Sequence, residues 1–170
     1  MNDRPRRSRR RNTGLKIFQA NVGKVGPWQD VALSLAWKGG FDIVLIQEPY
    51  TRWDKTANRR QTVNHPGYQA YNPLNDWREA RPSVLTFVRI SPNLPSKQLS
   101  PPGLENGCVC WVEVCGYTVV NIYRRASEDI TTETLTKWGR PPPRTIIAGD
   151  FNATHWTWQP GKKPDTAATE

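Results

Sequence analysis

The sequence predicts an α/β fold built in layers, with substantial antiparallel pairing between strands. The start of the chain shows a strand, a helix and a second strand, at residues 15–22, 27–38 and 41–47. Several strand patterns follow, and a helix candidate at residues 128–138 precedes a last strand that begins at Thr145. Strands and helices mixed in this order are typical of a layered α/β architecture. The length of 170 residues suits one domain.

The charge of the chain indicates a polyanionic partner. The net charge is +9 and the isoelectric point is about 9.8. Residues 1–12 carry six arginines against one aspartate, a net of +5, so the rest of the chain carries +4. We expect residues 1–13 to be a disordered arm for nucleic-acid binding or nuclear import, with a solvated tail as the alternative. Since no apolar run approaches roughly 20 residues and no signal peptide is recognisable, no membrane contact is expected.

The first strand and the helix follow from hydrophobic spacing. Residues 15–22 alternate, and Asn21 stands at the strand's end before a glycine. In residues 27–38, Val31, Leu35 and Trp28 recur at helical spacing, which predicts that they face the core, together with Ala32, Leu33 and Ala36. Both tryptophans of this helix are expected in the core: Trp28 and Trp37.

The second strand, at residues 41–47, is almost wholly apolar after Asp42, which predicts burial on both faces. Glu48 and Pro49 end it. A carboxylate at the end of a central strand is costly to bury without a cation or a donor. Glu48 is therefore either a solvated side chain or a ligand for a hard cation such as Mg²⁺.

Residues 50–66 form a polar segment in which basic side chains surround Trp53. They are Arg52, Lys55, Arg59 and Arg60. We interpret the segment as a long surface loop. It suits contacts with phosphates and bases, and an ordinary soluble loop is the equal alternative.

The middle of the chain supplies more strands. Residues 68–71 and 83–90 have strand patterns, and residues 91–107 form a proline-rich connector. Residues 108–115 and 117–124 predict a hairpin that turns near Gly116. Cys108 and Cys110 should share one face, as reduced thiols rather than metal ligands, in keeping with an intracellular protein.

The last strand ends in an acid and an amide. Asp150 and Asn152 should point the same way by strand alternation, and Phe151 should turn into the core. An acid beside an amide suits phosphate chemistry, although both residues are also common in turns. The strand at residues 117–124 ends similarly, with Tyr123 and Arg124. Together with Asn21 and Glu48, four strand ends thus carry polar groups. The segment at residues 160–170 looks unstructured.

These strand ends resemble the endonuclease/exonuclease/phosphatase superfamily. The matching blocks are Gln19-Ala20-Asn21-Val22, Ile46-Gln47-Glu48-Pro49, Asn121-Ile122-Tyr123 and Ile147-Ala148-Gly149-Asp150-Phe151-Asn152-Ala153. With His155 and Trp158 after the last block, the chain most resembles the endonuclease domain of LINE-type (non-LTR) retrotransposons. The resemblance covers residues 14–159. It implies a DNase I-like sandwich of two sheets flanked by helices.

The resemblance also implies roles for single residues. Glu48 would bind Mg²⁺, with Asn21 beside the metal and the phosphate. Tyr123 would contact the scissile phosphate, Asp150 would orient or deprotonate the attacking water, and Asn152 would hold the phosphoryl group. The implied partner is DNA, with a reverse transcriptase in a longer parent polyprotein and a nuclear location. Nucleic-acid contacts are expected from Arg52, Arg59, Arg60, Arg124 and His155.

Two departures from the family pattern lead to further expectations. The family adds a later Asp-His block, and neither His65 nor His155 matches its catalytic histidine. We therefore expect weak or no phosphodiester hydrolysis from this chain. We also expect a truncated fold whose second sheet is largely missing, which would leave an apolar sheet face uncovered. The alternatives are a non-catalytic nucleic-acid-binding fragment and a phosphatase-type protein acting on a small phosphate ester.

Overall fold

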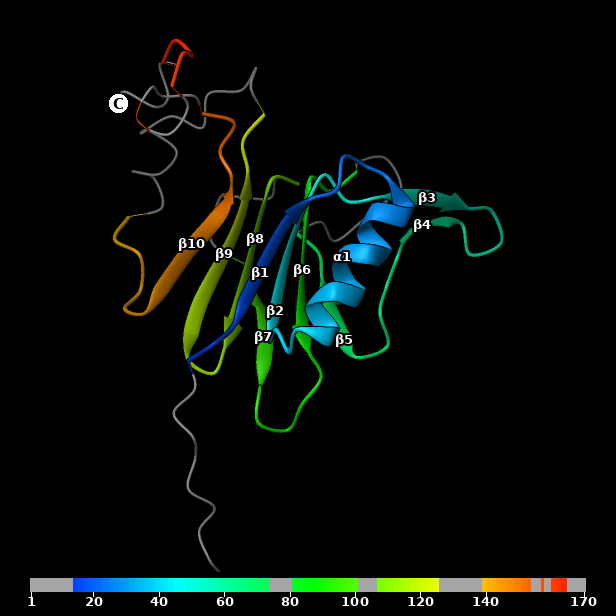
Figure 1. Cartoon of the computed structure of the whole chain (residues 1–170). Coiled ribbons are helices and arrows are strands. Elements are labelled where there is room, and N and C mark those ends of the chain that lie inside the picture. Colours follow the sequence, from blue (N-terminus) through cyan, green and yellow to red (C-terminus); the bar gives the residue numbers. More distant parts are fainter. Residues whose placement is uncertain are drawn as a thin grey trace, which may run out of the picture.

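The computed structural model describes residues 14–73, 81–100, 107–125, 139–153, 157 and 160–164. These residues form two four-stranded sheets packed face to face, with one helix on the outside and a small two-stranded hairpin beside it (Figure 1). The first sheet has the order β1 (Ile17–Asn21), β2 (Ile43–Gln47), β6 (Val84–Arg89) and β5 (Tyr68–Tyr71). The second has the order β10 (Thr145–Asp150), β9 (Tyr117–Tyr123), β8 (Val109–Val114) and β7 (Ser96–Leu99). The mixed α/β prediction is confirmed.

Each sheet contains one parallel pair of strands. β1 lies parallel to β2, with Asn21 opposite Gln47, and β10 lies parallel to β9, with Asp150 opposite Tyr123. The remaining pairs are antiparallel. Parallel strands end on the same side of a sheet, and hydrogen bonds from Asn21 to Asp150 and from Tyr123 to Glu48 bring the polar ends of the two parallel pairs together at one rim of the sandwich.

The core between the sheets explains why β2 is apolar throughout. Ile43 and Leu45 face the second sheet, where they pack with Val112 and Val119. Val44 and Ile46 face the other way and pack with Leu33, Ala36 and Phe87 under the helix α1 (Gly26–Lys38). All five residues of β2 are buried, which confirms the prediction for this strand.

The expectation of a largely missing second sheet needs correction, because four strands of it are present. The hairpin at residues 108–124 belongs to this sheet, where Val109 pairs with Ile122 and Trp111 with Val120. This hairpin and β10 cover the inner face of the first sheet, so no uncovered apolar face is found there among the described residues. On the far side of the second sheet, Val109, Trp111, Val120 and Ile122 are buried, whereas Ile147 of β10, which pairs with Val120, is 43% exposed.

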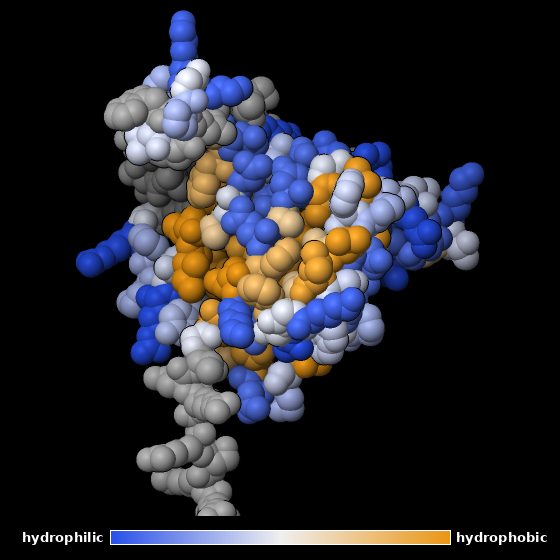
Figure 2. All heavy atoms as spheres, viewed as in Figure 1, coloured by the Kyte–Doolittle hydropathy of each residue, from blue (hydrophilic) through white to orange (hydrophobic). Residues whose placement is uncertain are grey.

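The predicted face of α1 is confirmed for Ala32, Leu33 and Ala36 and is wrong for the larger residues. Trp28, Val31 and Leu35 are 63%, 46% and 55% exposed, while the face toward the sheet consists of Gln29, Ala32, Leu33 and Ala36. Small alanines let the helix lie close to the sheet. Figure 2 shows the apolar side chains that remain on the outside of this region. Trp37 is also partly exposed, and the Arg89 guanidinium lies 4.1 Å from its ring centroid. No described helix is long and apolar enough to cross a membrane.

Two segments predicted as irregular contain strands. The polar segment after Glu48 forms a hairpin of β3 (Thr51–Asp54) and β4 (Arg59–Thr62), and β7 lies inside the predicted connector. Polar strands show little hydrophobic alternation, so the sequence pattern does not predict them. They become strands by hydrogen bonding to a neighbouring strand. The arm at residues 1–13, the predicted helix at 128–138 and His155 and Trp158 lie outside the described residues.

The three cysteines are free thiols. Cys108 and Cys110 do not share a face, because Cys108 packs on the outer side of the second sheet and Cys110 packs between the sheets. Cys108 precedes the first residue of β8, so strand alternation does not apply to it. Burial raises the pKa of the Cys110 thiol to about 12.

Candidate active site

The predicted site residues converge at the rim where the parallel strands end. Asn21 comes from β1, and Glu48 directly follows β2. Tyr123 and Asp150 end β9 and β10, so both sheets contribute. The edge strands of the two sheets are bridged by hydrogen bonds from Gln19 Nε2 to the Gly149 carbonyl (2.8 Å) and from Asn21 Nδ2 to Asp150 Oδ2 (2.9 Å).

Asp150 is held by two donors. Its Oδ2 accepts the bond from Asn21, and its Oδ1 accepts one from the Asn152 backbone amide at 3.0 Å. Asn152 itself has a φ of +44° and donates its side-chain amide to the Arg124 carbonyl at 2.6 Å. The structure thus brings the predicted acid and amide together. Phe151 was expected in the core and is 43% exposed, on the side of β10 that also carries the exposed Ile147 and away from Ala148, which packs between the sheets.

Glu48 leaves β2 in a left-handed conformation, with a φ of +48°. Its backbone N–H donates to the Ser83 carbonyl (2.8 Å), and its carbonyl accepts from the Lys24 N–H (2.7 Å). Its Oε1 accepts a 2.6 Å hydrogen bond from the Tyr123 hydroxyl and lies 3.8 Å from Lys24 Nζ. A non-glycine residue with a left-handed backbone costs on the order of 1 kcal/mol, and such strain concentrates at functional sites. Lys24 and Asn152 also have a left-handed backbone, with φ of +62° and +44°.

The contact with Glu48 controls the ionisation of Tyr123. The hydrogen bond to the Glu48 carboxylate, followed by burial and the carboxylate's charge, raises the pKa of Tyr123 to about 12. A hydrogen bond with the Asn152 side chain lowers the pKa of Tyr123. Tyr123 therefore stays a neutral donor at physiological pH, which suits a contact with a phosphate oxygen.

Replacing the carboxylate should lower the pKa of Tyr123. The pKa of Tyr123 in the folded protein lies above the unfolded value of about 10. The stability that the Tyr123–Glu48 hydrogen bond adds to the folded state is therefore fully present below pH 10, and it is lost as the pH rises through about 12. At about pH 11, the Glu48→Gln variant should therefore show more tyrosinate absorbance than the wild type. Tyr123→Phe supplies the baseline, and near-ultraviolet circular dichroism verifies folding. Equal tyrosinate absorbance in the wild type and in Glu48→Gln would contradict the hydrogen bond between Tyr123 and Glu48.

The donor set fits one hard cation held largely by water. Mg²⁺ is usually bound through one or two carboxylates and keeps several waters. Glu48 offers one carboxylate, whose Oε1 contacts the Tyr123 hydroxyl and Lys24 Nζ. Asp150 supplies a second carboxylate at the same rim. No group of three or more His, Cys, Asp or Glu side chains gathers into a metal cluster within the described parts of the chain. The set therefore suits Mg²⁺ better than a fully protein-ligated ion.

The predicted nucleic-acid contacts have different outcomes. Arg52 and Arg59 are exposed on the β3–β4 hairpin, and Arg60 lies with its guanidinium carbon 5.9 Å from the Trp53 ring centroid. Arg124 needs correction as a nucleic-acid contact, because it is only 7% exposed and its Nη1 donates to the carbonyls of Phe151 and Asn152. It braces the loop that carries Asn152. His155 lies outside the described residues.

The hairpin is tied firmly to α1. The side-chain amide of Gln29, which is fully buried, donates to Thr62 Oγ1 and to the Val63 carbonyl, both at 2.8 Å. Its oxygen accepts the Tyr50 N–H at 2.7 Å. The hairpin that carries the arginines thus has a fixed base next to the start of α1 (Figure 1).

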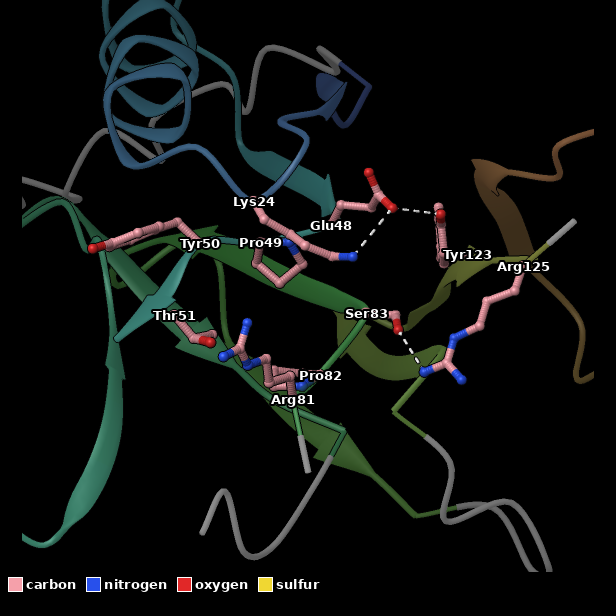
Figure 3. Close-up of a pocket in the computed structure, with 10 residues that line it drawn as sticks. All are labelled: Lys24, Glu48, Pro49, Tyr50, Thr51, Arg81, Pro82, Ser83, Tyr123 and Arg125. Carbon is pink, nitrogen blue, oxygen red and sulfur yellow. Dashed lines mark hydrogen bonds and ion pairs between the residues drawn. The ribbon is translucent and has the colours of Figure 1, made fainter. Parts of the chain in front are cut away.

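A basic pocket beside Glu48 was missed by the sequence reasoning. It has a volume of about 500 Å³, and Figure 3 shows its lining side chains. Glu48 and Tyr123 line it together with three cationic residues: Lys24, Arg81 and Arg125. The sequence contains one indication of this pocket. Arg125 is two residues after Tyr123, so strand alternation would place both side chains on the same side.

A buried pair of amides links the sheets behind the site. Gln47 Nε2 donates to Asn121 Oδ1 at 2.7 Å, and both side chains are fully buried. Asn121 Nδ2 donates to the Leu85 carbonyl at 3.0 Å. Gln47 precedes Glu48, and Asn121 lies two residues before Tyr123. The pair therefore fixes the relative position of the strands that carry these two site residues.

Comparison with known proteins agrees with this architecture. A family model described as the Endonuclease/Exonuclease/phosphatase family matches residues 2–166. No curated protein matches the chain. The endonuclease domain of TRAS1, a telomere-specific non-LTR retrotransposon, is similar in structure, with a TM-score of 0.67 and 22% identity over 91% of this chain and 68% of that one. An AP endonuclease from Archaeoglobus fulgidus has a TM-score of 0.50 and 15% identity over 82% and 58% of the two chains. These likenesses confirm the DNase I-like fold.

Proposed function

The chain belongs to the endonuclease/exonuclease/phosphatase family, and from this premise we propose that it carries the Mg²⁺-dependent endonuclease site of a non-LTR retrotransposon, with DNA as its substrate. The observation that carries the proposal is the meeting of two contacts at one rim. Asn21 binds Asp150, and Tyr123 binds Glu48, with Asn152 adjoining both Asp150 and Tyr123. An acid–base carboxylate, a metal-binding carboxylate and phosphate-binding donors are the groups that phosphodiester hydrolysis needs.

The side chains divide the work of in-line hydrolysis. Asp150, oriented by Asn21 and the Asn152 amide, accepts the proton of the attacking water. The Tyr123 hydroxyl, whose single proton goes to Glu48 in this structure, would turn that proton to a phosphoryl oxygen of the substrate, and the Asn152 side chain would hold a second oxygen. Glu48, with Asn21 beside it, would hold Mg²⁺, and the ion would supply positive charge for the phosphate and the leaving oxygen.

Binding of DNA rests on charge and on the fixed hairpin. Arg52 and Arg59 are exposed there beside Arg60 and Trp53, so the hairpin offers cations and a ring to a nucleic acid. The arm at residues 1–12 adds a net charge of +5. The same proposal includes a nuclear location and a reverse transcriptase in a longer parent polyprotein.

Nicking of supercoiled plasmid in the presence of Mg²⁺ tests the proposed activity. Removing Glu48 or Asp150 should lower the nicking rate by at least about 100-fold, since each performs a step that no neighbouring group replaces. Glu48→Gln and Asp150→Ala are the variants, and EDTA should stop the wild type. Glu113→Gln is the matched control, because this carboxylate lies on β8 and pairs with Lys97. Nicking that persists in Asp150→Ala would contradict the proposed site.

We expect the wild-type rate to be low, because neither His65 nor His155 matches the family's catalytic histidine. The test compares this chain with one extended through the downstream coding sequence. Nicking by the extended chain alone would support this expectation, and equal nicking by both would contradict it. No nicking by either chain would contradict the endonuclease proposal.

A non-catalytic nucleic-acid-binding role is the second candidate, and the basic arm favours it. In that case, salt-dependent DNA binding should disappear when residues 1–12 are deleted, and the Glu48 and Asp150 variants should behave like the wild type. Binding that survives the deletion would place the main DNA contacts on the folded part of the chain.

A further inference from the structure

Three cationic residues of the basic pocket beside Glu48 have no part in the steps described above: Lys24, Arg81 and Arg125. Resting on the proposed function, we propose that the pocket binds the phosphate next to the scissile one on the same DNA strand. Lys24, Arg81 and Arg125 would supply the positive charge. The proposal concerns how the strand is held, and it adds three residues to the substrate-binding surface.

The charges in the pocket favour an anion. Lys24, Arg81 and Arg125 face a single carboxylate, that of Glu48, so the formal charges of the lining sum to +2. The remaining lining residues carry no formal charge, and four of them offer hydroxyls: Tyr50, Thr51, Ser83 and Tyr123. Charges of one sign around a concavity focus the electric field and raise the local concentration of a counter-ion. Phosphate oxygens accept hydrogen bonds from guanidinium groups in pairs.

The position of the pocket indicates which phosphate it takes. Glu48 and Tyr123 line it, whereas Asn21, Asp150 and Asn152 do not. Glu48 and Tyr123, joined by their hydrogen bond, thus form the side of the pocket that adjoins the proposed active site (Figure 3). Because Tyr123 is the proposed contact of the scissile phosphate, a group in the pocket would lie beside that phosphate. The next phosphate of a strand follows at one nucleotide's distance, so it is the natural occupant.

The pocket is held in shape by the same contacts that hold Glu48. The Ser83 carbonyl accepts the Glu48 N–H (2.8 Å), and the Ser83 hydroxyl accepts a bond from Arg125 Nη2 (3.3 Å). Ser83 thus links a proposed metal ligand to a proposed phosphate-binding arginine. Pro49 and Pro82 form rigid parts of the wall. An arginine that is oriented in advance loses less conformational freedom when it binds phosphate.

The size of the pocket fits a sugar-phosphate unit better than a lone ion. Its volume of about 500 Å³ lies within the range of about 300–1,000 Å³ that is typical of ligand sites. The shared chemistry is a phosphate ester, which a DNA strand or a free nucleotide could supply. We favour the strand because the pocket adjoins the rim with the polar strand ends and lies beside Thr51, the first residue of the basic hairpin.

The salt dependence of DNA binding tests this proposal. Fluorescence anisotropy with a labelled duplex oligonucleotide is measured over a salt series in EDTA, on the full chain. Each phosphate contact contributes about 0.9 to the slope of log K against log salt. Arg125→Gln and Arg81→Gln should each reduce the slope by about 0.9. Both side chains are exposed, so these variants should remain folded.

Lys97→Gln is the matched control, because Lys97 lies on β7, at the sheet edge opposite β10, and pairs with Glu113. Its slope should equal that of the wild type. Arg125→Lys should keep the slope and lose part of the affinity, because it keeps the charge without the guanidinium fork. Unchanged slopes in both glutamine variants would overturn the proposal.

A competition experiment separates the two sources of phosphate. A nucleoside monophosphate or inorganic phosphate that binds the wild type and not Arg125→Gln, while the DNA slope is the same in both, would assign the pocket to a small phosphate ester and overturn the strand proposal. Because all binding is measured without Mg²⁺ and without turnover, the result does not depend on nicking. The pocket proposal and the endonuclease proposal can therefore fail separately.

Discussion

Gly149→Ala is expected to have the largest effect on stability. Gly149 has a φ of +157°, and a Cβ built on it would lie 1.9 Å from the Ile122 carbonyl oxygen and 2.8 Å from the Ile122 nitrogen. Both atoms belong to the backbone of β9, which cannot rotate away as a side chain would. The parallel pairing of β10 with β9 must therefore open. We expect a loss of about 3 kcal/mol or more in the free energy of unfolding, measured by urea denaturation.

Gly14→Ala is the control, because nothing lies within 4 Å of a Cβ there. It should change the urea midpoint little. The Gly149 variant should also release Asp150, since the Gly149 carbonyl accepts from Gln19 and Asp150 follows directly in the chain. If Gly149→Ala unfolded at the wild-type midpoint, the close approach of β9 and β10 at this residue would be wrong.

The residues that meet in the candidate site were predictable because strand ends follow from local sequence. Asn21, Glu48, Tyr123 and Asp150 each follow an apolar run, and parallel pairing then places them at one rim. The error at Arg124 came from ignoring alternation. Tyr123 points to the rim, so the next side chain turns inward, and Arg125 returns to the pocket.

The orientation of α1 could not be obtained from hydrophobic spacing. Its large apolar residues, such as Trp28 and Leu35, lie on one side, and its small ones, Ala32 and Ala36, lie on another. Which side faces the sheet depends on how closely the backbones approach. It depends also on Gln29, whose amide finds its partners in a hairpin more than 30 residues away. Neither factor has a local sequence pattern.

The division into two sheets was also beyond local patterns. Strand alternation is the same in either sheet, so the hairpin at residues 108–124 could have extended the first sheet. Its place in the second sheet is fixed by long-range contacts, among them the bond between Asn121 and Gln47. A single polar pair that selects one arrangement of two sheets should show strong energetic coupling.

A double-mutant cycle on Gln47 and Asn121 measures that coupling, and it is the second large effect that we expect. Asn121→Leu leaves the Gln47 amide hydrogen and the Leu85 carbonyl without their partner in a site with no exposure. An unsatisfied buried group costs about 1–3 kcal/mol, so the single variant should lose about 3 kcal/mol or more of unfolding free energy. Chemical denaturation monitored by tryptophan fluorescence measures the loss.

Gln47→Met should cost less, because Gln47 Oε1 is buried without a hydrogen-bond partner within the described residues, and methionine removes that group. The double variant, Gln47→Met with Asn121→Leu, places two apolar side chains of similar size in contact. It should lose about 1–3 kcal/mol less than the sum of the single variants. Strict additivity would mean that the amides act independently. The positions of Glu48 and Tyr123 would then depend on the surrounding apolar core, and the Tyr123 pKa should be unchanged in the double variant.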